Sequence, residues 1–288
     1  MQRVLYAGAA AVLSGWLAWQ TGAAIFHRGT AFFLINPQDG KVADGSYVNK
    51  YFGLTYPLPH GWKAGEAGPV PSQSAYYVLA TLIPDAERNA TILVAAQDTF
   101  FTTGAGGGVA DSARNFQQAV SNIAGMTVDR DVMEVMVANQ LLYRVDYSGV
   151  GLFRATFRTE IRCHIVSFNL TARDPALRTR LAQSFDRLSF AAGSGSRPPP
   201  CIKDYANGDN VLHKVRPLPV GPKFIPIPVR IIVGTDGSVK HVHVIRATDD
   251  QRRSIEEALY QWKFKPYELN GHPSPVETAL VFEFKADN

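Results

Sequence analysis

Two short stretches near the C-terminus decide the fold of that end of the chain. They are residues 236–244, with the sequence DGSVKHVHV, and residues 258–266, with the sequence ALYQWKFKP. The Asp-Gly pair lies between two runs rich in β-branched residues, at 229–233 and 239–245, which is a strong signal for a hairpin. Two antiparallel strands are therefore predicted on either side of this turn.

A helix is predicted to follow the hairpin. Thr248 and Gln251 fit a capping box, and apolar residues then recur at helical spacing as far as Trp262. Pro266 ends the helical register, and the Asn-Gly pair at 270–271 predicts a second turn. The order of elements is strand, strand, helix, and then one more strand.

That last strand is predicted at residues 276–284, where the side chains alternate between two faces. One face carries Thr278, Leu280, Phe282 and Phe284, and the other carries Glu277, Ala279, Val281 and Glu283. We expect Glu277 and Glu283 to face outward, where charge discourages indiscriminate pairing with other strands.

In this order, the motifs of residues 215–286 resemble the C-terminal domain of the TonB energy-transducer family. In that family the last strand is a sheet edge that captures an extended segment of an outer-membrane receptor by strand addition. The resemblance implies a partner-binding strand formed by Val276, Glu277, Thr278, Ala279, Leu280, Val281, Phe282, Glu283 and Phe284. The alternative is a stable outer strand with no partner. The Pro-rich stretch at 193–200 is much shorter than the stalk of the family's transducers.

The N-terminus predicts export from the cytoplasm. Residues 4–26 contain no acidic or basic residue and are long enough to cross a bilayer as a helix. We expect an uncleaved anchor in the inner membrane with periplasmic domains. A signal peptide cleaved near Ala23, which would leave a periplasmic protein, is the alternative.

Length and charge suggest the remaining layout. We expect a helix at 1–28, a domain at 46–192, a linker at 193–210 and a domain at 211–288. The net charge is only +4 and the basic residues are dispersed, so nucleic acid is not an expected partner.

The middle domain is expected to be an antiparallel sheet covered by helices. Strands are predicted at 76–82 and 90–97, three more within 137–170, and helices at 109–123 and 175–190. The opening at 47–62, YVNKYFGLTYPLPHGW, resembles the PsbP type of α/β/α sandwich, whose members are mostly binding or assembly proteins. The whole chain is therefore predicted to be α+β, with a small ββαβ domain at its C-terminus.

Several residues invite a chemical role but fit a plain structural one better. The spacing of Cys163 and Cys201 does not match a zinc-binding or redox motif. The sequence is therefore compatible either with a disulfide between them or with a buried free thiol at Cys163. His241 and His243 share one strand face without an evident third metal ligand, and solvent-facing positions are expected. The glycine-rich run at 104–108 lacks the ending of a phosphate-binding loop and is expected to be a mobile loop.

A basic stripe is also predicted on one strand face. If the strand is regular, Arg154, Arg158, Arg162 and His164 line up there, and such a stripe would bind an acidic peptide or an anionic ligand. A solvated sheet face carrying Glu160 as a counter-charge is the favoured interpretation.

Together these observations predict a cell-envelope binding protein with no catalytic residues, cofactor or metal. It would be a TonB-like energy transducer or a periplasmic scaffold that engages an outer-membrane receptor or another envelope protein by strand addition, with inner-membrane companion proteins. In the alternative, the PsbP-like domain is the working part of a periplasmic assembly or ligand-binding protein, and the C-terminal domain forms a homodimer. A hydrolase using His241 and His243 is disfavoured.

Overall fold

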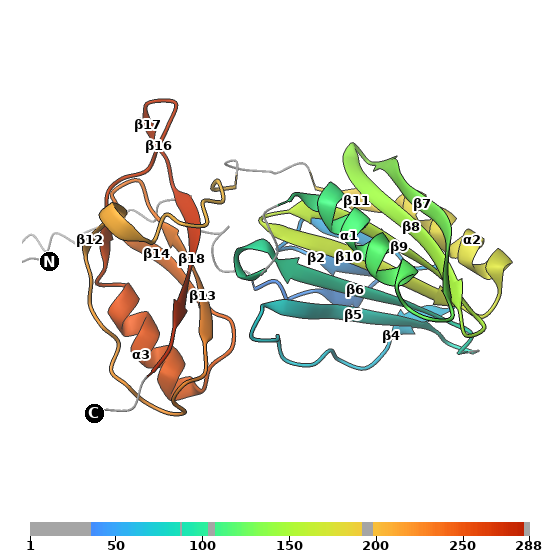
Figure 1. The fold of residues 1–288 in the computed structure, drawn as a ribbon, viewed down its shortest axis with the longest axis horizontal. Coiled ribbons are helices and arrows are strands. Elements are labelled where there is room, and N and C mark those ends of the chain that lie inside the picture. Colours follow the sequence, from blue (N-terminus) through green and yellow to red (C-terminus); the bar gives the residue numbers. More distant parts are fainter. Residues whose placement is uncertain (1–35, 87, 103–106, 192–197, 285–288) are drawn as a thin grey trace, which may run out of the picture.

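The computed structural model describes residues 36–86, 88–102, 107–191 and 198–284. The protein is α+β, with mostly antiparallel strands and few helices among these residues. Two separate hydrophobic cores are present, one in the middle of the chain and one at its C-terminal end. Figure 1 shows the two parts side by side.

A seven-stranded antiparallel sheet forms the centre of the middle domain in the described part of the chain. Its strands, in spatial order, are β4 (Trp62–Ala64), β5 (Tyr76–Pro84), β6 (Ala90–Asp98), β10 (His164–Ala172), β9 (Leu152–Ile161), β8 (Gln140–Gly149) and β7 (Met126–Val137). Side chains alternate across this sheet, so each face needs its own cover.

The two faces are covered differently. Helix α1 (Val109–Ser121) packs on β7, β8 and β9. The opposite face carries α2 (Pro175–Ser184) and a four-stranded sheet. That sheet consists of β1 (Lys41–Ala43), β2 (Ser46–Asn49), β3 (Leu54–Pro57) and β11 (Ser189–Phe190). The main core lies between this second layer and the large sheet, around Phe157, Phe168 and Phe185.

The structure corrects three details of the predicted sandwich. One outer layer contains a small sheet in addition to a helix. Strand β7 was not predicted, because it is the sheet's outer strand and the charged residues 129–131 interrupt its apolar alternation. The predicted helix over 175–190 ends at Ser184, and the 3-10 helices η1 (Thr99–Phe101) and η2 (Phe185–Arg187) and strand β11 complete the domain.

The C-terminal domain has the predicted order of strand, strand, helix and strand, with short strands added. Its elements are η3 (Gly208–Asn210), β12 (Val211–His213), β13 (Ile227–Val233), β14 (Val239–Val244), α3 (Asp249–Leu259), β15 (Lys263–Phe264), β16 (Glu268–Leu269), β17 (His272–Pro273) and β18 (Val276–Phe282). The main sheet has the order β14-β13-β18, and α3 covers one of its faces. Tyr205 and Ala206, in the segment expected to be a linker, are buried in this core.

Both predicted turns and the predicted cap are present. The side chain of Thr248 accepts from the Gln251 amide, and the Gln251 side chain accepts from the Thr248 amide, which completes the capping box. Asn270 and Gly271 both have positive φ, as a two-residue hairpin between β16 and β17 requires. Local signals therefore located the two turns and the start of α3 correctly, whereas α3 ends at Leu259, before the predicted end near Pro266.

Gly237 is needed for a close approach between two segments of this domain. Its φ is +71°, its carbonyl accepts from the Phe264 amide, and an added Cβ would lie within 2.0 Å of the Phe264 carbonyl oxygen. Gly271 has a similar φ of +77°, but an added Cβ there would meet nothing within 4 Å.

Gly237→Ala should therefore destabilise the protein much more than Gly271→Ala. Both substitutions incur the left-handed backbone penalty of about 1–2 kcal/mol. Only Gly237→Ala adds a clash with main-chain atoms, worth about 1–3 kcal/mol more. Urea unfolding of the two variants measures the difference, and equal losses would contradict the close approach.

The predicted N-terminal helix at 4–26 lies outside the described residues. Within the described residues, no helix has both the length and the apolar character needed to span a membrane.

Candidate partner-binding edge and the domain interface

Strand β18 is an outer strand of the three-stranded C-terminal sheet, in which its neighbour is β13. In an antiparallel ladder, alternate residues direct both main-chain groups toward the same side. The Glu277 amide donates to the Pro200 carbonyl and the Glu277 carbonyl accepts from the Ile202 amide, so both main-chain groups of Glu277 point away from β13. By the same alternation, the main-chain groups of Ala279, Val281 and Glu283 also point away from β13.

The chain itself occupies the first part of this edge. Residues 200–202 run parallel to β18 at Glu277. The segment that follows contacts the side chain of Thr278, whose hydroxyl accepts from the Ala206 amide and donates to the Lys203 carbonyl. Beyond Thr278, none of the described residues pairs with the outer side of β18. The open part of the edge is therefore Ala279 to Glu283.

A groove of about 650 Å³ follows this open part. Its walls come from both domains and from the segment between them, namely Phe100, Phe101, Lys203, Asp204, Ala206, Asn207, Lys214, Arg216, Pro217, Trp262 and residues 279–284. Val281 is 59% exposed here, whereas Val276 and Thr278 are fully buried. Of the nine predicted partner-binding residues, Val276, Glu277, Thr278 and Phe284 are buried, and residues 279–283 are at least partly accessible.

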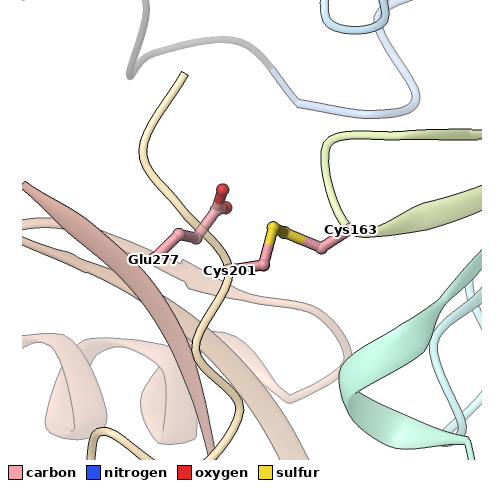
Figure 2. Close-up of side chains that lie close together, drawn as sticks. All are labelled: Cys163, Cys201 and Glu277. Carbon is pink, nitrogen blue, oxygen red and sulfur yellow. A yellow bond between two sulfur atoms is a disulfide. The ribbon is translucent and has the colours of Figure 1, made fainter. Parts of the chain in front are cut away.

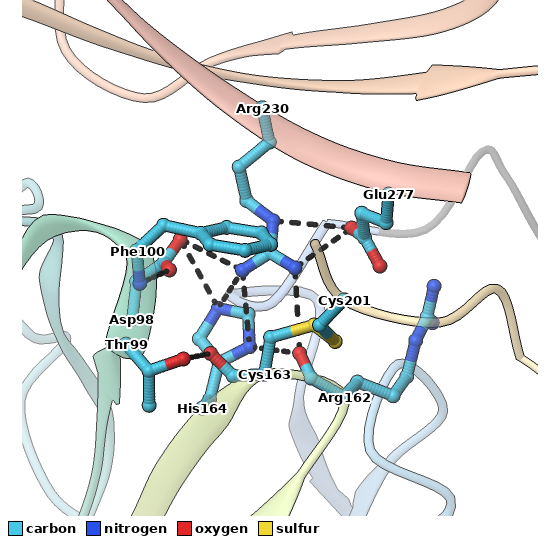
Figure 3. Close-up of a disulfide and its surroundings, with 9 residues drawn as sticks. All are labelled: Asp98, Thr99, Phe100, Arg162, Cys163, His164, Cys201, Arg230 and Glu277. Atoms are coloured by element: carbon cyan, nitrogen blue, oxygen red, sulfur yellow. Dashed lines mark hydrogen bonds and ion pairs between the residues drawn. A yellow bond between two sulfur atoms is a disulfide. The ribbon is translucent and has the colours of Figure 1, made fainter. Parts of the chain in front are cut away.

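The face of the sheet that carries Glu277 was predicted to be outward, and this is wrong. Glu277 is 4% exposed, because the middle domain covers this face. Its carboxylate accepts from Nη2 of Arg230 at 2.8 Å and from Nε at 3.1 Å (Figure 3). Glu283 is exposed, as predicted.

Arg230 is the centre of the contact between the two domains. Its Nη1 donates to the Asp98 carboxylate at 2.7 Å and lies 3.3 Å from Nε2 of His164. Asp98 is held at the end of β6, where its other oxygen accepts from the Phe100 amide at 2.9 Å. We call Asp98, His164, Arg230 and Glu277 the interface cluster. All four are buried.

The charges of the interface cluster compensate each other inside the protein. Burial alone would lower the pKa of Arg230, but the carboxylates of Asp98 and Glu277 raise it well above its usual value. Burial and the nearby Arg230 charge hold the pKa of His164 well below its usual value, so this imidazole is neutral. Its Nδ1 lies 2.7 Å from the Arg162 carbonyl and donates to it, which leaves Nε2 as an acceptor for Arg230.

His241 and His243 lie on the same sheet face as Arg230, as their register on β13 shows. They line a small space at the domain contact, so the prediction of solvent-facing histidines is wrong. Burial, followed by the Arg230 charge, lowers the pKa of His243 to about 3. Burial also lowers the pKa of His241.

Stability should consequently fall when the solution is acidified. His243 binds a proton near pH 6.5 in the unfolded chain but only near pH 3 in the folded protein, so its contribution is complete above about 6.5 and is lost below that pH. Between pH 7 and pH 5, His243 should cost about 2 kcal/mol. His243→Gln should reduce the difference between urea unfolding at the two pH values, and His60→Gln, at an exposed position, is the control.

Cys163 and Cys201 form a disulfide, with their Cα atoms 6.0 Å apart. The bond ties the β9–β10 turn of the middle domain to the segment that runs beside β18 (Figure 2). In the described part of the chain, the one group of three potential metal ligands is Cys163, Cys201 and Glu277. Because the disulfide uses both sulfurs, it leaves no thiolate there to hold a metal ion.

The basic stripe is only partly formed. Arg162 and Cys163 both have positive φ in the tight turn between β9 and β10, so His164 begins a new strand and faces the main core side of the sheet. Arg158 lies on the opposite face, below α1. Most of the glycine-rich run, residues 104–106, lies outside the described residues.

Sequence reasoning missed the interface cluster. Its members are spread over the chain from Asp98 to Glu277, and only the fold brings them together. One available signal was Arg230, a charged residue inside an otherwise apolar strand. Such a residue requires a buried partner.

One similar solved structure is cyanobacterial PsbP (CyanoP) from Synechocystis sp. PCC 6803, at 16% identity over 52% of this chain and 95% of that chain, with a TM-score of 0.38. Another is LpqN, involved in cell envelope biogenesis of Mycobacterium tuberculosis, at 15% identity over 47% of this chain and 82% of that chain, with a TM-score of 0.35. No curated protein matches the chain.

A family match covers the C-terminal domain, from β13 through β14 and α3 to β18, the strand that forms the candidate edge. Residues 226–286 match the family described as Gram-negative bacterial TonB protein C-terminal, which confirms the resemblance in this part of the chain.

Proposed function

We propose that this protein is a cell-envelope binding protein that engages a partner protein by adding a partner strand to β18 at residues 279–283. The observation that carries the proposal is the open main chain of Ala279, Val281 and Glu283 beside a groove of about 650 Å³. Unpaired edge groups are a template for another strand. The TonB-type family suggests the envelope as the location.

The groove would favour a strand with two different faces. Ala279 and Val281 lie on the sheet face that meets Phe100 and Phe101 of the middle domain, so one row of partner side chains should be apolar. Trp262 and Phe282 lie toward the other face, and Nζ of Lys214 is 5.1 Å from the Trp262 ring.

Basic side chains outnumber acidic ones along the groove, with Lys203, Lys214 and Arg216 against Asp204 and Glu283. The second row of partner side chains should therefore include acidic residues. An extended segment of an outer-membrane receptor with this alternation is the partner that we propose. An inner-membrane anchor at 4–26 would place the edge in the periplasm, and companion membrane proteins would make the protein an energy transducer.

The same arrangement supports binding in preference to catalysis. Asp98 and His164, which otherwise would suggest acid–base chemistry, are enclosed at the domain contact with their polar atoms directed at Arg230 or main-chain groups. We therefore propose that the protein is not an enzyme.

Site-specific photo-cross-linking in a Gram-negative host tests the proposed edge. A photoreactive residue at Val281 should form an adduct with an extended segment of an outer-membrane protein, and one at the exposed Glu257 on α3 should not. Lys214→Glu combined with Arg216→Glu should weaken the Val281 adduct by about tenfold, because it reverses two charges of the groove. An adduct with a second copy of this chain would instead favour self-association.

A further inference from the structure

Helix α1 leaves part of the large sheet uncovered, and a cavity of about 700 Å³ lies beside it. The cavity is on the face of the sheet opposite the main core. Leu93 and Ile165 provide apolar surface on adjacent strands, and Phe116 of α1 forms a wall. A mostly apolar hollow with a few polar groups is the usual form of a small-molecule site.

Arg158 is the cation of this cavity, and the protein holds it in place. Its Nη1 donates to the hydroxyl of Ser112 at 2.7 Å and to the Ser112 carbonyl at 3.3 Å. Its guanidinium carbon lies 4.4 Å from the centre of the Phe116 ring. These contacts with α1 fix the side chain but do not neutralise its charge.

Arg158 lacks a counter-charge among the described residues. Among the described residues, its side-chain hydrogen bonds go to Ser112 and not to a carboxylate, and its Nε is buried with no hydrogen-bond partner there. Asp111 also lines the cavity, but its carboxylate is 2.6 Å from Arg114. Partial burial lowers the pKa of Arg158, because it penalises the charged form of the guanidinium. A partly buried cation of this kind gains from an anionic partner.

We propose that this cavity binds a small monocarboxylate with an apolar body, with the carboxylate on Arg158. The guanidinium has donors left for a carboxylate after its contacts with Ser112. Tyr76 and Tyr147 line the same cavity and lie near the Arg158 charge. The apolar body would rest on Leu93, Ile165 and Phe116. A single cation favours one negative charge on the ligand.

Calorimetric titration of the full chain with three soluble probes tests this inference. 4-Phenylbutanoate carries both the anionic head and the apolar body, 4-phenylbutan-1-ol lacks the charge, and acetate lacks the body. We expect 4-phenylbutanoate to bind about tenfold or more tightly than either of the others, because a charge-assisted contact contributes this much. Equal affinity for the alcohol and the carboxylate would overturn the proposal.

Variants of the same strand locate the site. Arg158→Gln should weaken 4-phenylbutanoate about tenfold or more, while Arg154→Gln, four residues earlier on the same face of β9, should leave the affinity within about twofold. Arg158→Lys keeps the charge but loses the planar pair of donors, so it should bind less tightly than wild type even if Arg158→Gln does not fold. Unchanged affinity in a folded Arg158 variant would contradict the assignment.

Discussion

Replacing Arg230 with alanine is expected to lower the free energy of unfolding by about 3–5 kcal/mol, the usual loss when one partner of a buried ion pair is removed. The substitution would leave the carboxylates of Asp98 and Glu277 buried without their shared cation. Urea unfolding at neutral pH measures the loss. Lys240→Ala, which breaks an exposed pair with Asp236, should cost less than about 1 kcal/mol.

A triple variant separates the cause of that loss from a simple packing defect. Arg230→Met with Asp98→Asn and Glu277→Gln removes the cation and both anions together. Since neutral groups cost far less to bury, the triple variant should recover at least about half of the stability that the single variant loses. An Arg230→Ala loss below about 1 kcal/mol, or no recovery in the triple variant, would show that the interface cluster does not hold the domains together.

Removing the disulfide is also expected to have a large effect. Replacing Cys163 and Cys201 with alanine removes a cross-link between residues that are 38 apart in the chain. The free energy of unfolding should fall by about 2–4 kcal/mol. Dithiothreitol should reproduce most of this loss in the wild type and none of it in the double variant.

The same change should loosen the segment that runs beside β18. The Glu277 amide donates to the Pro200 carbonyl next to the disulfide, so its hydrogen exchange should accelerate in the double variant. The Leu280 amide, on the side of β18 that pairs with β13, is the matched control. Unchanged exchange at Glu277 would mean that the segment stays paired without the bond.

Local patterns predicted the C-terminal domain well. The Asp-Gly and Asn-Gly turns, the capping box at Thr248 and the alternation of the last strand depend on neighbours in sequence, and the structure contains all of them. The TonB-type resemblance is confirmed for residues 226–286. Such features are predictable because their physical cause is local.

What could not be predicted depends on contacts between distant segments. Alternation placed Glu277 on the correct face, but only the docked middle domain shows that this face is buried. The same contact partly covers His243 and lowers its pKa. A tight turn at Arg162 and Cys163 interrupts the predicted basic stripe. Cys163, in this turn, forms the disulfide with Cys201. Strand β7 was not predicted because charged residues interrupt the apolar alternation of this partly exposed outer strand.

Amide hydrogen exchange at single-residue resolution along β18 of the full chain is the most direct test of the proposed binding edge. In the free protein, the amides of Ala279, Val281 and Glu283 should exchange fast and the Leu280 amide slowly, because only the former point away from β13. Saturation with the receptor segment that cross-links to Val281 should slow all three. If the three amides are already as slow as Leu280 in the free chain, or stay fast when the segment is bound, strand addition at β18 is wrong.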